Sequence, residues 1–557
     1  MDNANDKLTI VGGGIVGALE AYFAYKEAKK EDKQIRVTVY DKNEDLSKTT
    51  ILNIVPSFTP DEILSVVPRG TALVEKLGLL FSEPGGIRVD NVPNVNGTEV
   101  AGRFISEVQA YSTDEDGHKQ RTRALLKLGR RSMELWQQIY DEADRDLQQI
   151  MRDSNFNPCR ETLSDQRVLH DGYRIDLIYN MPNAQKRAEG MQADYESLGY
   201  VNCKVLTPDE VETMDPALAE FCSANSTQTD SGRVWKNDAT ALFRPGGCID
   251  TAVFLPKLYA YLQRVMGTYT NEAGARKDCF RLKFNREVDD VLYADDIRPV
   301  INGLHFANGA NKINKHAYQS SQYVFCPGEA VGTLSELGFI EPAYAGFAGP
   351  SLRLRIPVQP EQLVEVADFN HCMEVHQEGV VLAWQARCIG DQIFIGVAGT
   401  KAFYGDQTPN IDQDFARNRN LLQLNMINDV LPQFISIALG RDTRGQKLTA
   451  ADLNALVDKG IAKRWVGTRA VAYDGFPTLG NLYVQGYNDI AKVENARTTT
   501  HLGSGGGSFG PAAVVFSRAA ADLNKPKPPS TKTDQIDLFV AEIAEYSSSA
   551  RKATLKV

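Results

Sequence analysis

The sequence predicts a mixed fold, with an α/β unit that begins near the N-terminus and a second part rich in β-strands. The first observation is an apolar strand at 8–11 that runs into a glycine turn. The second is the return of strand, turn and helix at 322–337, which is consistent with a late strand of the same parallel sheet. The third is a run of β-forming residues over 351–400.

The N-terminal unit consists of a strand, a helix and a second strand. Leu8–Val11 has the pattern of a buried strand, and 18–30 continues as a helix that ends in a charged turn. Arg36–Tyr40 forms the second strand, and Asp41 stands at its end. Strand, glycine turn, helix and second strand in this order predict the start of a parallel sheet.

The glycines between strand and helix have the spacing of a dinucleotide-binding turn. Gly12 permits the tight turn, Gly14 lets the backbone approach a pyrophosphate, and Gly17 lets the helix pack closely on the strand. The helix N-terminus adds N–H groups and a partial positive charge. Asp41 can accept hydrogen bonds from ribose hydroxyls. We therefore predict a dinucleotide site, since an ordinary turn would leave this acidic residue unexplained.

The rest of the chain alternates between helical and strand patterns. Apolar residues at three- and four-residue steps predict helices over 120–152 and 251–266. Thr207 followed by Glu210 predicts a capping box. The other expected strands are Tyr173–Tyr179, Phe280–Phe284, Val288–Tyr293, Asn302–Phe306 and one from Gln322, and the other expected helices are Ala184–Leu198, Pro208–Met214, Val331–Leu337, 412–430 and one after a 524–530 linker.

Length and composition limit the class of protein. A chain of 557 residues is too long for one ordinary core, so two or more domains are expected. The net charge of −10 argues against a nucleic-acid partner. The polar N-terminus is unlike a secretory signal, and no apolar run reaches the length of a membrane helix, so we predict a cytoplasmic protein with no transmembrane segment. The eight cysteines lack paired spacing, and no metal site is predicted.

Three separated segments resemble a known family. The first is the N-terminal fingerprint that ends at Asp41. The second, Thr50–Pro56, is similar to a second cofactor-contacting stretch, and the third combines Trp465–Gly480 with His501–Gly507. Together they resemble the FAD-dependent amine and amino-acid oxidoreductases typified by D-amino-acid oxidase, glycine oxidase and sarcosine oxidase.

The resemblance implies a Rossmann-type FAD-binding domain, discontinuous in sequence, with an inserted substrate domain built on a mainly antiparallel sheet. The implied reaction is hydride transfer from the carbon that bears the amine to flavin N5, followed by hydrolysis of the imine. The substrate would be a small molecule, either an amino acid or an amine, and the electron acceptor stays open among oxygen, a quinone and a protein. The implied ranges are 1–110, 240–340 and 460–523 for the FAD-binding domain, 111–239 and 341–459 for the substrate domain, and 524–557 for a linker and C-terminal helix.

The resemblance also assigns site residues. Arg469 matches the arginine of a tryptophan–glycine–arginine motif, and its guanidinium can pair with a substrate carboxylate; a salt bridge between domains is the alternative. His501 is the second candidate catalytic residue, and 503–507 is expected to face the flavin or, alternatively, to be a flexible linker. The expected cofactor-binding residues are Gly12, Gly14, Ile15, Val16, Gly17, Asp41, Lys42, Thr50, Asn53, Gly328, Gly503, Gly505, Gly506, Gly507 and Ser508.

Two other functions stay open at this point. Alanine at 470 stands where the family often has proline, and Thr50–Pro56 is atypical. These departures leave room for a catalytically silent FAD-binding regulatory or interaction protein. An FAD-dependent hydroxy-acid dehydrogenase, which acts on a C–O bond, is the other alternative.

Overall fold

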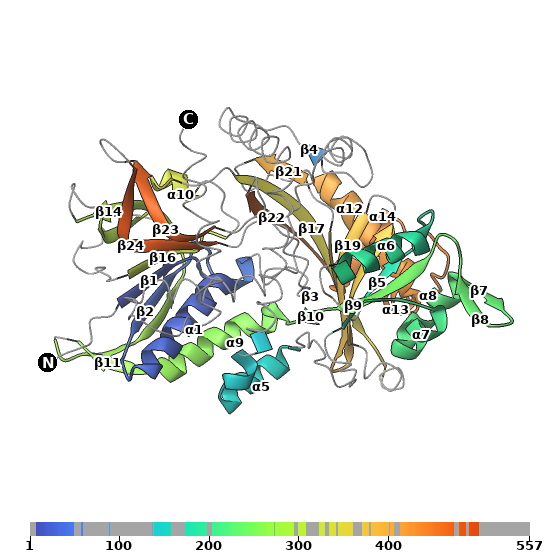
Figure 1. The fold of residues 1–557 in the computed structure, drawn as a ribbon, viewed down its shortest axis with the longest axis horizontal. Helices are drawn as coiled ribbons and strands as arrows, with labels where there is room; N and C mark the ends of the chain where they lie inside the picture. The colour runs from blue at the N-terminus through green and yellow to red at the C-terminus, as the bar shows by residue number, and fades with distance from the viewer. Residues whose placement is uncertain are drawn as a thin grey trace.

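Two large sheets organise the protein, a six-stranded sheet on the left of Figure 1 and a ten-stranded sheet on the right. The computed structural model describes residues 7–49, 57–58, 88–89, 136–137, 139–156, 173–197, 203–271, 273–294, 299–307, 322–328, 333–340, 344–359, 370–377, 380–399, 402–405, 413–472, 478–485 and 490–500. The protein is therefore a mixed α/β structure.

The six-stranded sheet is built around β1 (Lys7–Val11). β2 (Arg36–Tyr40) pairs with it in parallel on one side, and β16 (Gln322–Phe325) pairs in parallel on the other. The expectation that the strand from Gln322 belongs to the same parallel sheet is confirmed. The remaining strands are β13 (Phe280–Lys283) beyond β2, and β24 (Ile490–Thr500) and then β23 (Thr478–Gln485) beyond β16; only β23 runs antiparallel to its neighbour.

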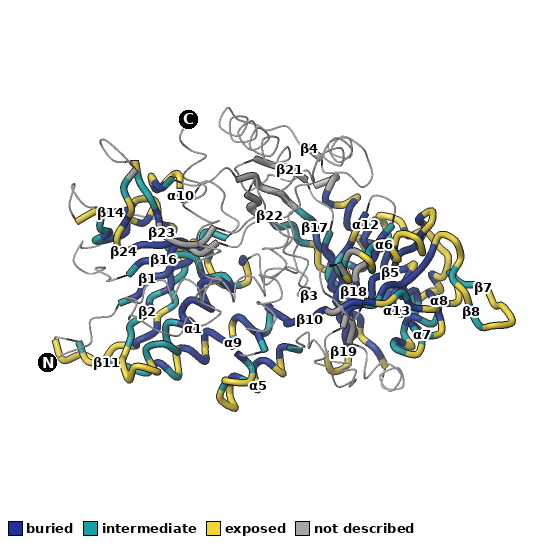
Figure 2. The backbone as a smooth tube through the Cα atoms, in the orientation of Figure 1, coloured by how far each residue is buried: buried dark blue, intermediate teal, exposed yellow. Residues whose placement is uncertain are grey.

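Helices α1 (Ile15–Lys30), α5 (Arg145–Asp153) and α9 (Thr251–Met266) pack against this sheet in one apolar cluster. Side chains such as Leu19 of α1 and Phe254 of α9 are fully enclosed there. Figure 2 shows the central strands as largely buried, together with the N-terminal half of α1. Burial of apolar side chains on both sides of the turn between β1 and α1 fixes that turn in place.

The predicted helix over 120–152 is interrupted within its described part. The helical turns that end at Glu142 stop before Asp144, and α5 begins directly after it. The Asp144 carboxylate accepts a hydrogen bond from the Leu147 N–H at 2.9 Å, which is the geometry of a helix N-cap. The prediction of one continuous helix is wrong here because a capping side chain competes with helix continuation.

The ten-stranded sheet is mainly antiparallel. Its centre consists of β17 (Tyr344–Pro357), β20 (Gln392–Gly399) and β19 (Val380–Ile389), each antiparallel to the next. Its other strands are β18 (Asn370–Gln377), β5 (Tyr173–Ile178), β9 (Thr240–Pro245) and β6 (Lys204–Leu206) on one side, and β22 (Ala462–Ala472), β21 (Ala402–Gly405) and β4 (Arg88–Val89) on the other. β9 and β22 also pair within this sheet. The domain ranges implied by the sequence stay a prediction.

One face of the ten-stranded sheet is apolar and is covered by three helices. Leu354, Trp384 and Ile395 lie on this face, and all three are fully enclosed. Residues alternate between faces along a strand, so the residues next to them project to the other face. The covering helices are α12 (Gln413–Val430), α13 (Pro432–Leu439) and α14 (Ala450–Asp458).

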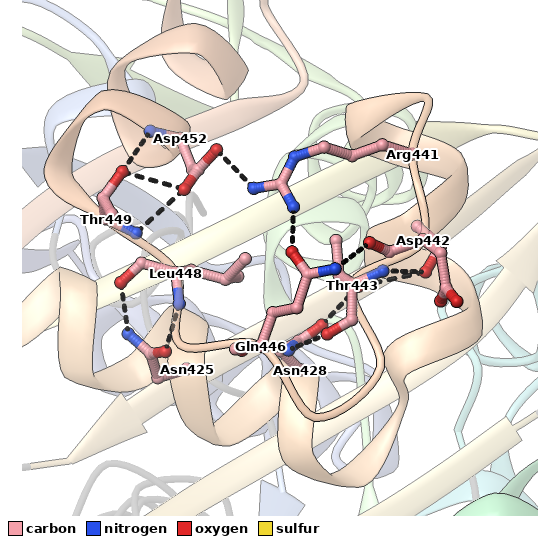
Figure 3. A network of polar contacts seen from close by, with 10 residues as sticks. Asn425, Asn428, Arg441, Asp442, Thr443, Gln446, Leu448, Thr449 and Asp452 are labelled. Atoms are coloured by element: carbon pink, nitrogen blue, oxygen red, sulfur yellow. Dashed lines mark hydrogen bonds and ion pairs between the residues drawn. The ribbon is translucent and has the colours of Figure 1, made fainter.

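A polar network holds these three helices together (Figure 3). The Asn428 amide donates to the Thr443 carbonyl at 2.9 Å, and the Thr443 hydroxyl donates to Asn428 Oδ1 at 2.6 Å. The Asn425 amide and the Leu448 backbone exchange two hydrogen bonds of 2.8 and 3.2 Å. The side-chain amides of Asn425 and Asn428 therefore have hydrogen-bond partners for both their oxygen and their nitrogen.

The remaining elements are short or peripheral. The capping box predicted at Thr207 and Glu210 is confirmed at the start of α7. Within the described ranges, no helix is both long and apolar enough to cross a membrane. The short or peripheral elements are β3 (Ser57–Phe58), β10 (Gly247–Cys248), α6 (Ala184–Ser197), α7 (Pro208–Met214), α8 (Ala219–Ala224), β7 (Ser226–Thr229), β8 (Gly232–Trp235), β11 (Thr268–Thr270), β12 (Arg276–Asp278), β14 (Val288–Tyr293), β15 (Ile301–Phe306), α10 (Thr333–Glu336) and the 3-10 turns Leu46–Lys48 and Pro216–Leu218.

Candidate functional site

The candidate site lies at the carboxyl edge of the six-stranded sheet. β1, β2, β16 and β24 are parallel, so their carboxyl ends meet at one edge. The chain passes from β1 to β2 on one side and returns later to β16 on the other side of β1. Such a change of direction opens a crevice between the loops that leave the two neighbouring strands, which is where open α/β sheets bind ligands.

The glycine turn after β1 is tightly packed at two of its positions. Gly12 has a φ of +113°, and its N–H donates to the Tyr40 carbonyl at 2.8 Å. A Cβ atom at Gly12 would lie 2.1 Å from the Cys326 carbonyl oxygen, and one at Gly17 would lie 2.0 Å from the Gly12 carbonyl oxygen. Both positions therefore exclude a side chain through contacts within the protein itself.

Gly14 differs from these two glycines. It is the N-cap of α1 with a φ of −74°, a conformation that any residue can adopt. No described atom lies within 4 Å of the place where its Cβ would stand, and no side chain of a described residue caps this end of α1. An open position at a helix N-terminus fits a pyrophosphate group, which needs backbone N–H donors and close approach.

Asp41 connects the end of β2 to this turn. Its Oδ2 accepts a hydrogen bond from the Gly13 N–H at 2.7 Å, and its Oδ1 accepts one from the Asn43 N–H at 2.8 Å. The carboxylate is buried, and a Cβ at Gly13 would lie 2.9 Å from Oδ2. Gly13 is thus needed for the contact between Asp41 and the turn, a role that its place in the sequence did not reveal.

A buried charged pair lies behind the turn and joins α1 to β24. Glu20 Oε2 is 3.7 Å from Arg497 Nη2, and both side chains are almost completely enclosed. Burial lowers the pKa of Arg497, while the nearby Glu20 carboxylate opposes that shift. Burial also raises the pKa of the Cys326 thiol well above its usual value, so this cysteine is not activated as a nucleophile.

The other predicted site residues lie in several places. Ile15 and Val16 form the buried first turn of α1, Lys42 is exposed after Asp41, and Gly328, with a φ of +60°, follows β16 at the same edge. Arg469 lies on β22, opposite Phe347 of β17 in the register. The residues outside the described ranges are Thr50, Asn53, His501, Gly503, Gly505, Gly506, Gly507 and Ser508.

The tryptophan and glycine of the C-terminal motif have a packing role. A Cβ at Gly467 would lie 1.8 Å from the Trp465 ring, so the ring lies over this glycine. Trp465 also packs against the apolar cluster of the six-stranded sheet. The face of the ten-stranded sheet that carries Trp465 is therefore directed toward the first sheet and its helices.

The same face carries polar residues that the sequence did not identify. Arg387 of β19 forms a buried ion pair with Asp250, the N-cap residue of α9. Gln385 lies two residues before Arg387 and is fully buried. Among the described residues, neither its Oε1 nor its Nε2 has a hydrogen-bond partner. No periodicity distinguishes this glutamine in the sequence, because its exceptional feature is the absence of a partner.

Of three comparisons with known proteins, only the comparison with solved structures found matches. No protein-family model matches the chain, and no curated protein sequence matches it. Solved structures that resemble it include glycine oxidase from Bacillus cereus, at 11% identity and a TM-score of 0.49 over 93% of this chain and 96% of that one. NikD, an unusual amino acid oxidase essential for nikkomycin biosynthesis, has 13% identity and a TM-score of 0.48 over 96% and 97%.

L-Amino acid deaminase from Proteus myxofaciens has 12% identity and a TM-score of 0.45 over 96% of this chain and 92% of that one.

Proposed function

We propose that the protein is an FAD-dependent oxidoreductase that oxidises the C–N bond of an amino acid or a secondary amine. The observation that carries the proposal is the junction of Asp41 with the glycine turn, at the edge where five parallel strands end. There, the place of a Cβ atom at Gly14 is open, whereas the places at Gly12 and Gly17 are closed by packing. This arrangement matches what the ribose and pyrophosphate of a dinucleotide require.

The residues of the turn have separate tasks in this proposal. The first-turn N–H groups of α1 would hold the pyrophosphate, and Asp41 would accept hydrogen bonds from a ribose. The choice of FAD over NAD depends on the motifs at 465–480 and 501–507. When bound, FAD supplies a two-electron acceptor for a hydride from the carbon that bears the amine. Arg469 would orient the substrate by its carboxylate.

The function can be tested with the purified protein and its visible spectrum. We expect a flavin spectrum that is bleached under anaerobic conditions by an amino acid or a secondary amine. Bleaching only by hydroxy acids would favour a dehydrogenase acting on a C–O bond. A bound flavin that dithionite reduces, but no organic probe reduces, would favour a silent binding protein. A protein that takes up no FAD would contradict the cofactor assignment.

Replacing Arg469 with alanine tests the proposed carboxylate contact. We expect KM for a carboxylate-bearing substrate to rise by about tenfold to a hundredfold, because a charge-assisted hydrogen bond to the substrate is lost. The flavin spectrum should not change. Arg464→Ala is a matched control, since Arg464 is an exposed arginine on the same strand. An unchanged KM in Arg469→Ala would remove this residue from the substrate site.

A further inference from the structure

We propose that Gln385, together with Arg353, recognises the amino-acid end of the substrate, so that a carboxylate and an amine on one carbon are both required. The inference rests on the proposed function and makes it more specific. It selects α-amino acids over amines that lack a carboxyl group. It also assigns substrate recognition to the ten-stranded sheet, on strands β19 and β17, in addition to Arg469.

Gln385 and Arg353 lie in one row across the sheet. Gln385 pairs with Gly396 of β20, and Gly396 pairs in turn with Arg353 of β17. Residues paired directly across strands project to the same face, and two strand spacings separate these two Cα atoms by about 10 Å. Gly396 between them contributes no side chain. The ends of a glutamine and an arginine at this separation can both reach one small ligand.

Other contacts of this face place the row between the two sheets. Arg387, on the same face as Gln385, forms its ion pair with the N-cap of α9. α9 packs in the cluster of the six-stranded sheet, as Trp465 does. Gln385 therefore faces the part of the protein that carries the candidate cofactor site. The helices α12 to α14 cover the opposite face.

Gln385 is exceptional because it is buried without hydrogen bonds. Its side chain is 0% exposed, and among the described residues both polar atoms lack a partner. Gln423 is also 0% exposed, but its Nε2 donates to the Pro350 carbonyl at 2.8 Å and its Oε1 accepts from Asn420 at 2.9 Å. A buried amide without partners destabilises the folded state, so its presence is accounted for if a ligand supplies the missing partners.

The chemistry of the row identifies the ligand. The free Oε1 of Gln385 requires a donor, such as an ammonium group, and its free Nε2 requires an acceptor. Arg353 contributes guanidinium donors, which match a carboxylate. Burial lowers the pKa of Arg353 to about 10, and the Asp250 carboxylate opposes that shift, so the guanidinium stays charged at neutral pH. A zwitterion with an ammonium group and a carboxylate on one carbon supplies the donor and the acceptor that Gln385 lacks, and its carboxylate matches the guanidinium of Arg353.

The test uses the flavin-loaded protein and matched pairs of probes that differ only in the carboxyl group. The pairs are alanine and ethylamine, phenylalanine and phenethylamine, and proline and pyrrolidine, with both enantiomers of each amino acid. Perturbation and bleaching of the flavin spectrum give a dissociation constant for each probe. We expect at least one amino acid to bind at least about tenfold more tightly than its paired amine, because the amine lacks the charged contact.

Gln385→Met is the decisive variant, and Gln423→Met is its control. Gln385→Met should raise the dissociation constant of that amino acid by at least about tenfold, with no loss of thermal stability, since the amide has no partner to lose. Gln423→Met should lower the unfolding midpoint by about 2 °C or more and leave amino-acid binding unchanged. This opposite pair of outcomes separates recognition from structural support.

Three results would overturn the inference. They are equal affinity of the wild type for the amino acid and its paired amine, an unchanged dissociation constant in Gln385→Met, and loss of FAD affinity in Gln385→Met without any substrate. The last result would assign Gln385 to the flavin itself. Failure of the proposed function is distinct, because then the protein lacks FAD or no probe bleaches it. Amino-acid binding without bleaching, weakened in Gln385→Met, would still support the inference.

Discussion

Gly12→Ala is expected to lower the free energy of unfolding of the cofactor-free protein by about 2 to 5 kcal/mol. A φ of +113° is strained for any residue with a Cβ, and this contributes about 1 to 2 kcal/mol. The new Cβ would also lie 2.1 Å from the Cys326 carbonyl oxygen, so β1 and β16 would have to move apart, at a further cost of about 1 to 3 kcal/mol. Thermal unfolding followed by circular dichroism measures the loss, and FAD affinity should fall with it.

Gly14→Ala is the matched control, and it separates folding from cofactor binding. Its φ of −74° suits alanine, and no described atom lies within 4 Å of the added Cβ. The cofactor-free variant should therefore unfold at the wild-type temperature. Its affinity for FAD should nevertheless fall, because the methyl group occupies the approach of the pyrophosphate. Equal FAD affinity in Gly14→Ala and the wild type would contradict the proposed position of the cofactor.

The glycine turn could be predicted from the sequence because its determinants lie close together along the chain. Gly17 is constrained by the Gly12 carbonyl of the same turn, and the order of strand, glycines, helix and acidic residue carries that information; the contact of Gly12 with Cys326, just after β16, lies far away in the chain. The contact between Asp41 and Gly13 follows from the parallel pairing of β1 and β2. The spacing of the motif therefore predicted both the turn and the acidic residue beside it.

The polar face of the ten-stranded sheet could not be predicted in the same way. Gln385, Gly396 and Arg353 lie on three strands, and their alignment depends on strand register. Strand patterns indicate which residues alternate but not which strands become neighbours. The break before α5 was missed for another reason. The apolar spacing continues through 120–152, and only the Asp144 side chain stops the helix.

Asp250→Asn is expected to destabilise the protein by about 3 kcal/mol or more, because it leaves buried Arg387 without a carboxylate. Asparagine keeps the volume of aspartate and can still cap α9, where Asp250 Oδ1 accepts from the Ala252 N–H at 2.9 Å. The variant therefore isolates the charge. Asp250 also lies near Arg353, so the guanidinium of Arg353 loses its field as well. Thermal and denaturant unfolding measure the effect.

Asp146→Asn is the control against which the loss of stability in Asp250→Asn is compared. Its partner Arg264 lies 2.8 Å away, but both side chains are more than half exposed, so the variant should change stability by less than about 1 kcal/mol.

Combining Asp250→Asn with Arg387→Met removes both charges, and we expect part of the lost stability to return. Asp250 caps a helix of the first apolar cluster, whereas Arg387 belongs to the ten-stranded sheet. A loss in Asp250→Asn no larger than in Asp146→Asn would therefore show that this pair does not hold the two sheets together.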